Sequence, residues 1–312
     1  MQTSAHFLVG PTAVGKSRVA QWIAEQAGRA ILSADSMQVY RGMDIGTAKP
    51  SGAERTRVIH YGIDLTAPGV SFSVADWLAA AQAAFAAQAP GTLLVVGGTG
   101  LYMRCLIEGL RGGAAPDPVA RARWQAVFEN SGVAGLQEAL RARQPEALAA
   151  LADAQNARRL IRALELTEGG AALPERAWPA RSAHVPFVGL RMEAEALKTR
   201  IESRVRAMYD HGFVAEVEGL LAGAAPLSET ARQAIGYAEA IALLAGQCTR
   251  EEAVMRTVQR TRQYAKRQRT WFARQASVDW IDVAPDAPVE AIGKAVLARW
   301  AELGATAVRA EG

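Results

Sequence analysis

The sequence predicts an α/β protein in which a parallel sheet is flanked by helices and an all-helical domain is inserted into the chain. Three observations predict this class. Short apolar runs alternate with helical patterns over the first third of the chain, as is typical of a parallel sheet with helices on its faces. Two linker-like stretches, 111–118 and 168–179, then enclose residues with helical patterns only. After them, the apolar run 184–192 predicts a strand that rejoins the sheet.

The predicted elements divide between a core at 1–112 and 184–312 and an insertion at 113–183. In the first third we expect strands at 6–9, 30–33 and 93–96 and helices at 16–27 and 74–88. In the insertion we expect helices at 118–130, 133–143 and 156–168. In the rest of the core we expect helices at 194–211, 214–222, 229–245, 249–274 and 288–302 and a strand at 278–281.

Composition excludes several classes of protein. The uncharged stretch 77–103 contains Pro90 and several glycines, so we expect a helix and a strand there and no membrane span. The N-terminus enters the first strand almost at once and leaves no room for a signal peptide, which favours a cytoplasmic location. Cys105 and Cys248 stand far apart without a Cys/His cluster, so we expect packing residues and neither a disulfide framework nor structural zinc.

Residues 10–17 read GPTAVGKS and match the phosphate-binding pattern G-x-x-x-x-G-K-[ST], which predicts a core like that of P-loop NTPases. Glycines let several backbone N–H groups converge on one anion, and the following helix adds the positive end of its dipole. Lys16 is expected to contact the terminal phosphate, and the Ser17 hydroxyl is expected to ligate Mg²⁺. The predicted diphosphate contacts are Gly10, Pro11, Thr12, Ala13, Val14, Gly15, Lys16 and Ser17.

Two predicted strands end in polar or glycine-rich segments beside this loop. Asp35 follows the strand at 30–33, and the run 97–100 (GGTG) follows the strand at 93–96. Ligands of parallel sheets bind outside the carboxyl ends of the strands. Asp35 is therefore a magnesium ligand, a general base or a helix cap, and Thr99 faces the site or caps a helix. The missing carboxylate after 93–96 argues against an ATPase or GTPase but leaves a kinase open.

The net charge of +4 comes from one segment, 253–278, which contains seven basic residues and no acidic one. These residues suit RNA phosphates, and Tyr264, Trp271 and Phe272 lie between them. The alternative is a packed helix with a solvent-exposed basic face, a buried stripe and Trp271 in the core. The predicted stripe is Val254, Val258, Thr261 and Ala265, and the basic residues are Arg256, Arg260, Arg262, Lys266, Arg267, Arg269 and Arg274.

Six segments together resemble the bacterial tRNA dimethylallyltransferases over nearly the whole chain. They are GPTAVGKS, SADSMQVYRGMDIGTAKP (33–50), VGGTGLYMRCLIEGL (96–110), RRLIRALEL (158–166), AIGYAEA (234–240) and AKRQRTWFAR (265–274). The resemblance implies transfer of a dimethylallyl group from dimethylallyl diphosphate to the exocyclic amine of the adenine 3′ of the tRNA anticodon. It also implies Asp35 as the general base, Thr99 near the reacting centre, and Lys16 and Arg204 as stabilisers of the leaving diphosphate.

The resemblance further implies how tRNA is held. The partners are dimethylallyl diphosphate with Mg²⁺ and the tRNA anticodon stem-loop, and the chain is expected to act as a monomer. The insertion would close on RNA as a clamp. The implied tRNA contacts are Asp35, Ser36, Met37, Gln38, Thr99, Arg121, Arg158, Arg159, Leu160, Ile161, Arg162, Arg260, Lys266 and Arg267.

The sequence departs from the family pattern in two places and leaves other functions open. Ala238 stands where a basic residue is common, which puts one RNA contact in doubt, and Tyr61 and Gly62 replace a His and a larger residue. The alternatives are isopentenyl transfer to free AMP or ADP, a P-loop kinase of a small metabolite, and a non-catalytic RNA-binding protein. The insertion and the basic helix favour an RNA substrate, because a mononucleotide enzyme needs neither.

Overall fold

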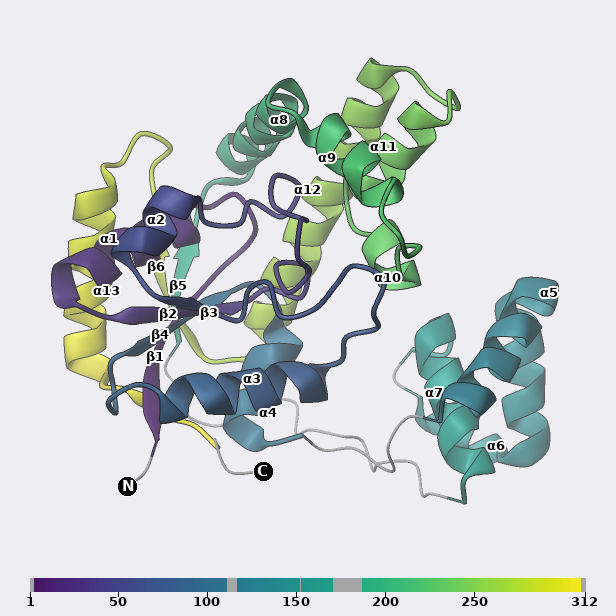
Figure 1. The fold of residues 1–312 in the computed structure, drawn as a ribbon. Helices are drawn as coiled ribbons and strands as arrows, with labels where there is room; N and C mark the ends of the chain where they lie inside the picture. Colours follow the sequence, from purple (N-terminus) through teal and green to yellow (C-terminus); the bar gives the residue numbers. More distant parts are fainter. Residues whose placement is uncertain (1–2, 111–116, 152, 171–186, 310–312) are drawn as a thin grey trace. The chain divides into compact units, whose positions relative to one another are not determined.

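The computed structural model describes residues 3–110, 117–151, 153–170 and 187–309. The chain forms two compact units, one made of Met1–Gly109 and Arg181–Gly312 and the other of Leu110–Ala180 (Figure 1). The predicted boundaries at 112/113 and 183/184 lie outside the described residues, as do most residues of the two predicted linkers.

The described part of the first unit is built on a seven-stranded sheet. Parallel strands run in the order β3-β2-β4-β1-β5-β6, and the short strand β7 pairs antiparallel with β1. Every residue of β2 and β4 is buried, as expected for parallel strands with helices on both faces. The strands are β1 (Ser4–Val9), β2 (Ala30–Ala34), β3 (His60–Tyr61), β4 (Leu93–Gly97), β5 (Phe187–Arg191), β6 (Val278–Asp282) and β7 (Thr306–Ala307).

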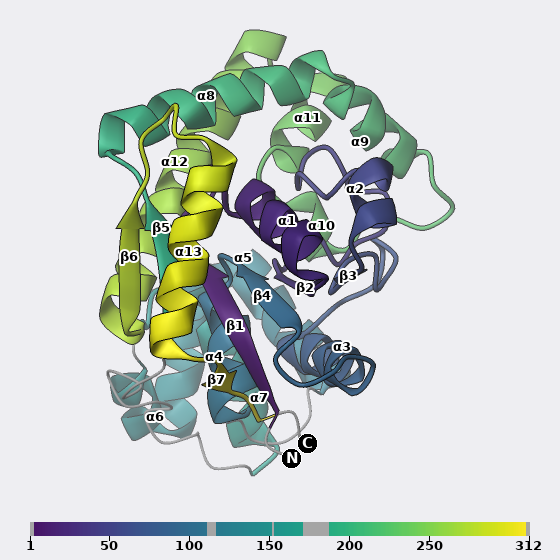
Figure 2. The same cartoon turned by 90° about the vertical axis from the view of Figure 1, so that its left-hand side faces the viewer.

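Helices cover both faces of this sheet (Figure 2). Helices α1 and α13 pack together on one face, while α3 and α4 pack together on the other. Helix α12 contacts α4, α8 and α11, so it joins the sheet to the helices that follow β5. The helices of this unit are α1 (Lys16–Ala27), α2 (Gly52–Arg57), α3 (Val74–Ala86), α4 (Gly100–Glu108), α8 (Ala194–Asp210), α9 (Phe213–Leu221), α10 (Glu229–Arg232), α11 (Tyr237–Leu244), α12 (Arg250–Gln275) and α13 (Val289–Leu303).

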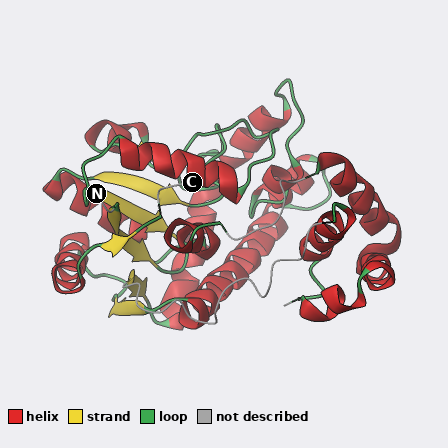
Figure 3. Cartoon of the chain, turned by 90° about the horizontal axis from the view of Figure 1, so that it is seen from below, coloured by secondary structure: helices red, strands yellow, loops and turns green. Residues whose placement is uncertain are grey.

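The described residues of the second unit form helices (Figure 3). They are α5 (Pro118–Arg143), α6 (Pro145–Ala150) and α7 (Ala157–Glu168). Trp124, Leu136, Leu140, Leu160 and Leu164 pack into a core of their own. The apolar residues of α7 are spaced so that they lie on one face of the helix and are buried together. This spacing explains why the short segment is helical.

The structure confirms the predicted fold class, a parallel sheet flanked by helices with a phosphate loop after the first strand. Sequence patterns gave no bounds for α2, β3, α6 and β7, which are too short to show a clear period, nor for α4. The predicted helix at 229–245 is wrong in one respect: it is interrupted before α11, where Gly236 adopts a φ of 93°. The predicted helices at 118–130 and 133–143 are joined in α5, which bends at Gly132.

Two predictions from composition can be compared with the structure. No helix within the described ranges is long and apolar enough to cross a membrane. Both cysteines are free thiols, with Cys105 buried and Cys248 half-buried, in agreement with the prediction that they are packing residues.

Candidate active site

The phosphate loop connects β1 to α1 and has an unusual backbone. Gly10, Ala13 and Gly15 have φ angles of 141°, 67° and 105°, which turn successive N–H groups toward one side. A side chain at Gly10 would also collide with the carbonyl of Leu190 in β5. Glycine is therefore required at this position for both conformation and space, and α1 begins directly after the loop at Lys16.

Lys16 is buried at the centre of the loop. Its Nζ donates a hydrogen bond to the carbonyl of Pro11 at 2.7 Å. The pKa of Lys16 is lowered to about 7, mainly by burial and to a smaller extent by the positive charge of Arg204, while the carboxylate of Asp35 opposes the shift. The ammonium is therefore close to its titration point until an anion binds beside it.

Two arginines of α8 face the same loop. Arg204 is half-buried and donates a hydrogen bond from Nη1 to Thr12 Oγ1 at 3.3 Å. Burial lowers the pKa of its guanidinium, and Asp35 opposes this shift. Arg200 lies one turn earlier, with Nη2 3.6 Å from the position of a Cβ built on Gly15. Sequence reasoning missed Arg200, although its spacing of four residues from Arg204 puts both on one helical face.

Asp35 and Thr99 meet where β2 and β4 end. The two strands are neighbours, with Ala34 opposite Gly97. Asp35 Oδ1 accepts a hydrogen bond from the N–H of Met37 at 2.9 Å, so it does not cap a helix. Thr99 precedes α4 but makes no side-chain capping bond; its Oγ1 instead accepts from the N–H of Ser36 at 3.2 Å. The predicted meeting of these two strand ends is therefore present.

The loop and the strand ends share one cavity of about 420 Å³. Its lining includes Lys16, Ser17, Asp35, Arg200 and Arg204, so the predicted diphosphate and base residues face a common space. Arg18, which sequence reasoning also missed, adds a further positive charge at its edge. A separate groove of about 530 Å³ between α8 and α12 is mainly apolar and contains Lys266 but none of the predicted catalytic residues.

Helix α12 packs directly against the glycine run after β4. A side chain at Gly98 would collide with Gln268, and a side chain at Gly100 would collide with the ring of Trp271. Gln268 is buried and contacts both the phosphate loop and β4. Burial and the nearby carboxylate of Asp35 raise the pKa of the Tyr264 hydroxyl, so it stays neutral. Gly98 and Gly100 are thus required because α12 passes immediately beside them, whereas a side chain at Gly97 would collide with the backbone of Ala34 in β2.

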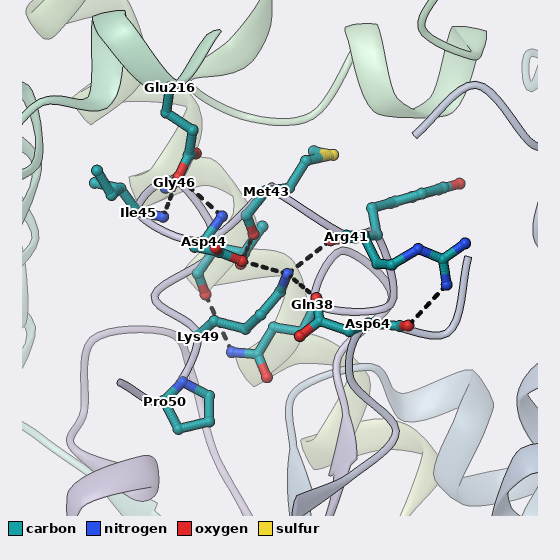
Figure 4. Close-up of polar contacts among 12 residues, drawn as sticks. Gln38, Arg41, Met43, Asp44, Ile45, Gly46, Lys49, Pro50, Asp64 and Glu216 are labelled. Carbon is teal, nitrogen blue, oxygen red and sulfur yellow. Dashed lines mark hydrogen bonds and ion pairs between the residues drawn. The ribbon is translucent and has the colours of Figure 1, made fainter. Parts of the chain in front are cut away.

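Residues 43–50 are here called the wall segment, and residues 47–50 of this segment line the cavity (Figure 4). Lys49 belongs to it and is fully buried. Its Nζ donates to Tyr40 O at 2.7 Å, to Asp44 Oδ1 at 2.5 Å and to Asp64 Oδ1 at 2.6 Å. An ammonium has three donors, and all three are used. Lys49 therefore lies beside the cavity without being available to a phosphate.

Glu216 of α9 holds the N-terminal part of the wall segment (Figure 4). Its carboxylate accepts hydrogen bonds from the N–H groups of Asp44 at 2.9 Å, Ile45 at 2.6 Å and Gly46 at 3.3 Å. The hydroxyl of Tyr237 donates a fourth bond at 2.7 Å. Consecutive N–H groups that surround an anion form a nest, so an internal carboxylate fixes this turn.

Gln38, a predicted tRNA contact, lines the cavity, and its contact with RNA stays a prediction. Gln38 is buried, its Oε1 accepts from Ser33 Oγ at 2.8 Å, and its Nε2 donates to the carbonyls of Thr47 at 3.1 Å and Ala48 at 3.2 Å. The carboxamide therefore holds the wall segment (Figure 4). Ser36 and Met37 are half-buried beside Asp35, and their contact with RNA stays a prediction.

The predicted RNA contacts of the second unit divide into two groups. Leu160 and Ile161 are buried in the core of this unit, and RNA contact at these positions stays a prediction. The charged residues are at or near its surface. Arg121 and Arg162 each form an ion pair with the buried Glu165 at 2.9 Å, while Arg158 and Arg159 are exposed. RNA contact by these arginines stays a prediction.

The basic helix α12 has the two predicted faces. Val254, Val258 and Ala265 of the predicted stripe are buried and Thr261 is half-buried, whereas Lys266 and Arg267 are exposed. Phe272, predicted among the aromatic residues facing RNA, is fully buried. Arg267 lies over the ring of Tyr264 at 5.8 Å. Arg260 is engaged within the protein, with Nη1 2.6 Å from Glu239 Oε1 and Nη2 2.7 Å from Gln233 O. Trp271 is half-buried, packs against the core and covers Gly100, in agreement with the interpretation of it as a packing residue.

A phosphate loop and a strand-end carboxylate that face one cavity define a group-transfer enzyme that acts on a phosphorylated substrate. Residues 38–275 match the family described as IPP transferase, and residues 3–61 match the family described as isopentenyl transferase. The chain belongs to the IPP transferase family.

Individual relatives resemble the chain over nearly its whole length. A tRNA dimethylallyltransferase of Corynebacterium efficiens is 40% identical over 293 residues, which cover 91% of this chain and 96% of that protein. The tRNA dimethylallyltransferase 2 of Geotalea uraniireducens is 42% identical over 291 residues, which cover 88% and 91%. The crystal structure of a tRNA isopentenylpyrophosphate transferase from Bacillus halodurans is similar with a TM-score of 0.66 and 35% identity, covering 97% and 98%.

Proposed function

We propose that this enzyme transfers the dimethylallyl group of dimethylallyl diphosphate to the exocyclic amine of the adenine 3′-adjacent to the tRNA anticodon, with release of diphosphate. The observation that carries the proposal is the single cavity in which Lys16, Ser17, Arg200 and Arg204 face Asp35. Cations there can stabilise a leaving diphosphate, and a carboxylate can accept a proton from the attacking amine.

The phosphate-loop side of the cavity stabilises the leaving group. The bond between the allylic carbon and the diphosphate oxygen breaks while the bond from that carbon to the adenine nitrogen forms. Negative charge then accumulates on the diphosphate, where Lys16, Arg200, Arg204 and the backbone N–H groups of the loop are directed at it. Preorganised donors of this kind cost no reorganisation at the moment of reaction.

Asp35 accepts the proton that the adenine amine loses. The amine gains positive charge as it attacks, because its lone pair is drawn toward carbon. Asp35 is half-buried, and the hydrogen bond from Met37 N–H fixes its carboxylate at the cavity. The proton passes from the amine to this carboxylate, an effect typically worth roughly 10² to 10⁴ in rate.

Mg²⁺ suits the residues of this cavity. The ion commonly uses one or two protein ligands together with substrate phosphates and water. Among the described residues no group of three or more His, Cys, Asp or Glu side chains could hold a metal alone. The Ser17 hydroxyl is exposed at the start of α1 and lines the cavity, so it would hold the ion jointly with the diphosphate. When bound, Mg²⁺ would neutralise charge on the leaving group.

The tRNA is proposed to bind through exposed basic residues. Lys266 and Arg267 on α12 and Arg158 and Arg159 on α7 are exposed and suited to phosphate contacts. Closure of the second unit on the anticodon arm would then act as a clamp, and the adenine would leave the loop stack to enter the cavity. A cytoplasmic monomer is the form that we propose for this reaction.

The alternatives differ in the acceptor. Transfer to free AMP or ADP would need neither the second unit nor the exposed basic face of α12. A metabolite kinase would need magnesium ligands suited to a triphosphate, and β4 ends in glycines instead of a carboxylate. A non-catalytic RNA-binding protein would have no use for a phosphate loop opposite Asp35.

One experiment separates these functions. The protein and Mg²⁺ are incubated with radiolabelled dimethylallyl diphosphate and, separately, unmodified tRNA, AMP or no acceptor. We expect label in tRNA alone. Label in AMP alone, or ATP turnover stimulated by a small acceptor, would overturn the proposal.

Asp35→Asn tests the chemistry of the site. The amide keeps the size of the side chain but cannot accept a proton, so turnover should fall at least about 100-fold while the affinity for dimethylallyl diphosphate stays within about twofold. Asp286→Asn, at an exposed loop residue, is the control and should behave as wild type. Near-normal turnover of Asp35→Asn would rule out its role as the base.

A further inference from the structure

Gln268 joins the basic helix to the phosphate loop. Its Oε1 accepts a hydrogen bond from the N–H of Thr12 at 2.8 Å, and its Nε2 donates to the carbonyl of Gly98 at 3.1 Å. The side chain is buried, so both bonds are sheltered from water. A carboxamide is the side-chain group that can accept at one end and donate at the other without charge.

The bond to Thr12 controls more than one residue. The N–H of Thr12 and the carbonyl of Pro11 belong to one peptide group, which is planar and directs these two atoms to opposite sides. The N–H is held by Gln268, and the carbonyl accepts the hydrogen bond from Lys16 Nζ at 2.7 Å. Fixing one side of this peptide therefore fixes where the ammonium of Lys16 is held on the other side.

The second bond anchors the carboxamide itself. Gly98 stands in the run after β4, where any side chain would collide with Gln268. The carboxamide is thus held between the end of β4 and the loop after β1, two strands that are neighbours in the sheet. Neither position has freedom to move without breaking a buried hydrogen bond.

On the basis of the proposed function, we infer that Gln268 is a positioning residue: it fixes the Pro11–Thr12 peptide and so places Lys16 for the diphosphate. The side chain does not itself contact the reacting atoms. It comes from the helix whose exposed face carries Lys266 and Arg267. The same helix therefore serves the diphosphate loop from its buried face and is available to RNA on its exposed face.

The test compares wild type, Gln268→Met and Gln259→Met. Methionine is unbranched and of similar length, so it fills the space without making either hydrogen bond. Gln259 is exposed on the same helix and serves as the matched control. We expect Gln268→Met to lower kcat/KM for dimethylallyl diphosphate roughly 10- to 100-fold, mainly through KM, while KM for tRNA stays within about twofold.

Gln268→Glu gives a signature that a purely structural role would not produce. A protonated carboxylic acid can accept from Thr12 N–H and donate to Gly98 O, but a carboxylate has no donor. We expect this variant to have a near-normal KM for dimethylallyl diphosphate at low pH and a raised KM at high pH. Lys16, Asp35 and Arg204 are charged groups of the same cavity and give the wild type a pH dependence of its own. The quantity compared is therefore the difference between the pH profiles of KM in the variant and in wild type.

Binding of inorganic diphosphate, measured by calorimetry, tests the role of Gln268 without depending on the transfer reaction. If wild type transfers no label to tRNA, the proposed function fails, yet Gln268→Met should still bind diphosphate at least about tenfold more weakly than Gln259→Met. Equal diphosphate affinity in these two variants, or equal losses in KM for both substrates, would overturn the role of Gln268.

Discussion

The depressed pKa of Lys16 leads to a prediction about proton uptake. Burial and Arg204 lower this pKa from 10.5 to about 7 in the free enzyme. A bound diphosphate favours the charged ammonium and raises the pKa again. At pH values above 7 the free enzyme therefore holds Lys16 mainly neutral, and binding must bring in a proton. We expect dimethylallyl diphosphate without acceptor to bind with uptake of about 0.9 proton at roughly pH 8.

The affinity should follow the same titration. The binding-competent form is the protonated one, so affinity is fully present below the free-enzyme pKa and is lost as the pH rises through it. With a free pKa of about 7, the apparent Kd should rise roughly 50-fold between about pH 7 and pH 9. That factor corresponds to about 2.3 kcal/mol of binding free energy.

Titration calorimetry in two buffers of different ionisation enthalpy measures the proton count directly. Lys16→Met should bind more weakly and take up no proton, because it cannot titrate. Lys294→Met, at an exposed position of α13, should behave as wild type. A flat affinity between pH 7 and 9, with no proton uptake in wild type, would mean that Lys16 stays charged and that burial does not set its pKa.

Three further substitutions test other parts of the structure. Glu216→Gln puts an amide N–H against backbone N–H groups, so we expect about 1–3 kcal/mol lower stability and reduced kcat/KM, whereas Glu218→Gln, exposed on the same helix, should change neither. Gly98→Ala should displace Gln268 and lower activity as much as Gln268→Met does. Both substitutions disrupt the same contact between Gly98 and Gln268, so their effects should not add in the double variant. Fully additive losses would show that the two substitutions act through different contacts. Leu160→Ala should destabilise the second unit by about 2–5 kcal/mol in denaturant titrations, and an accompanying loss of diphosphate affinity would show that the units are not independent.

The diphosphate side of the site was predictable because its signals are local. The loop is a short motif with fixed spacing, and Asp35 follows from the rule that parallel strands present their carboxyl ends to ligands. Both features depend on residues close together in the sequence or on neighbouring strands. The parallel sheet was predictable for the same reason, since each strand and helix shows its own period.

Other parts of the site could not be predicted because distant residues decide them. Gln268 reaches Thr12 across 256 positions of the chain, and a lone glutamine in a basic helix has no sequence signal. Lys49 and Glu216 read as ordinary surface charges until the fold places them together. For Gln38 and Leu160 the resemblance gives a position in the chain, whereas the burial of each side chain is decided by residues elsewhere in the fold.

The internal ion pairs of the wall segment give the cavity a polarity. Lys49 is matched by Asp44 and Asp64, and Asp64 is matched in turn by Arg55, so these charges cancel locally. The remaining positive charge of the cavity lies on the phosphate loop and α8, where the carboxylate of Asp35 offsets part of it. The electrostatic field of the cavity attracts the anionic end of an entering molecule and not its apolar end. The cavity can thus orient its substrate before any contact is made, and higher salt should weaken this orientation first.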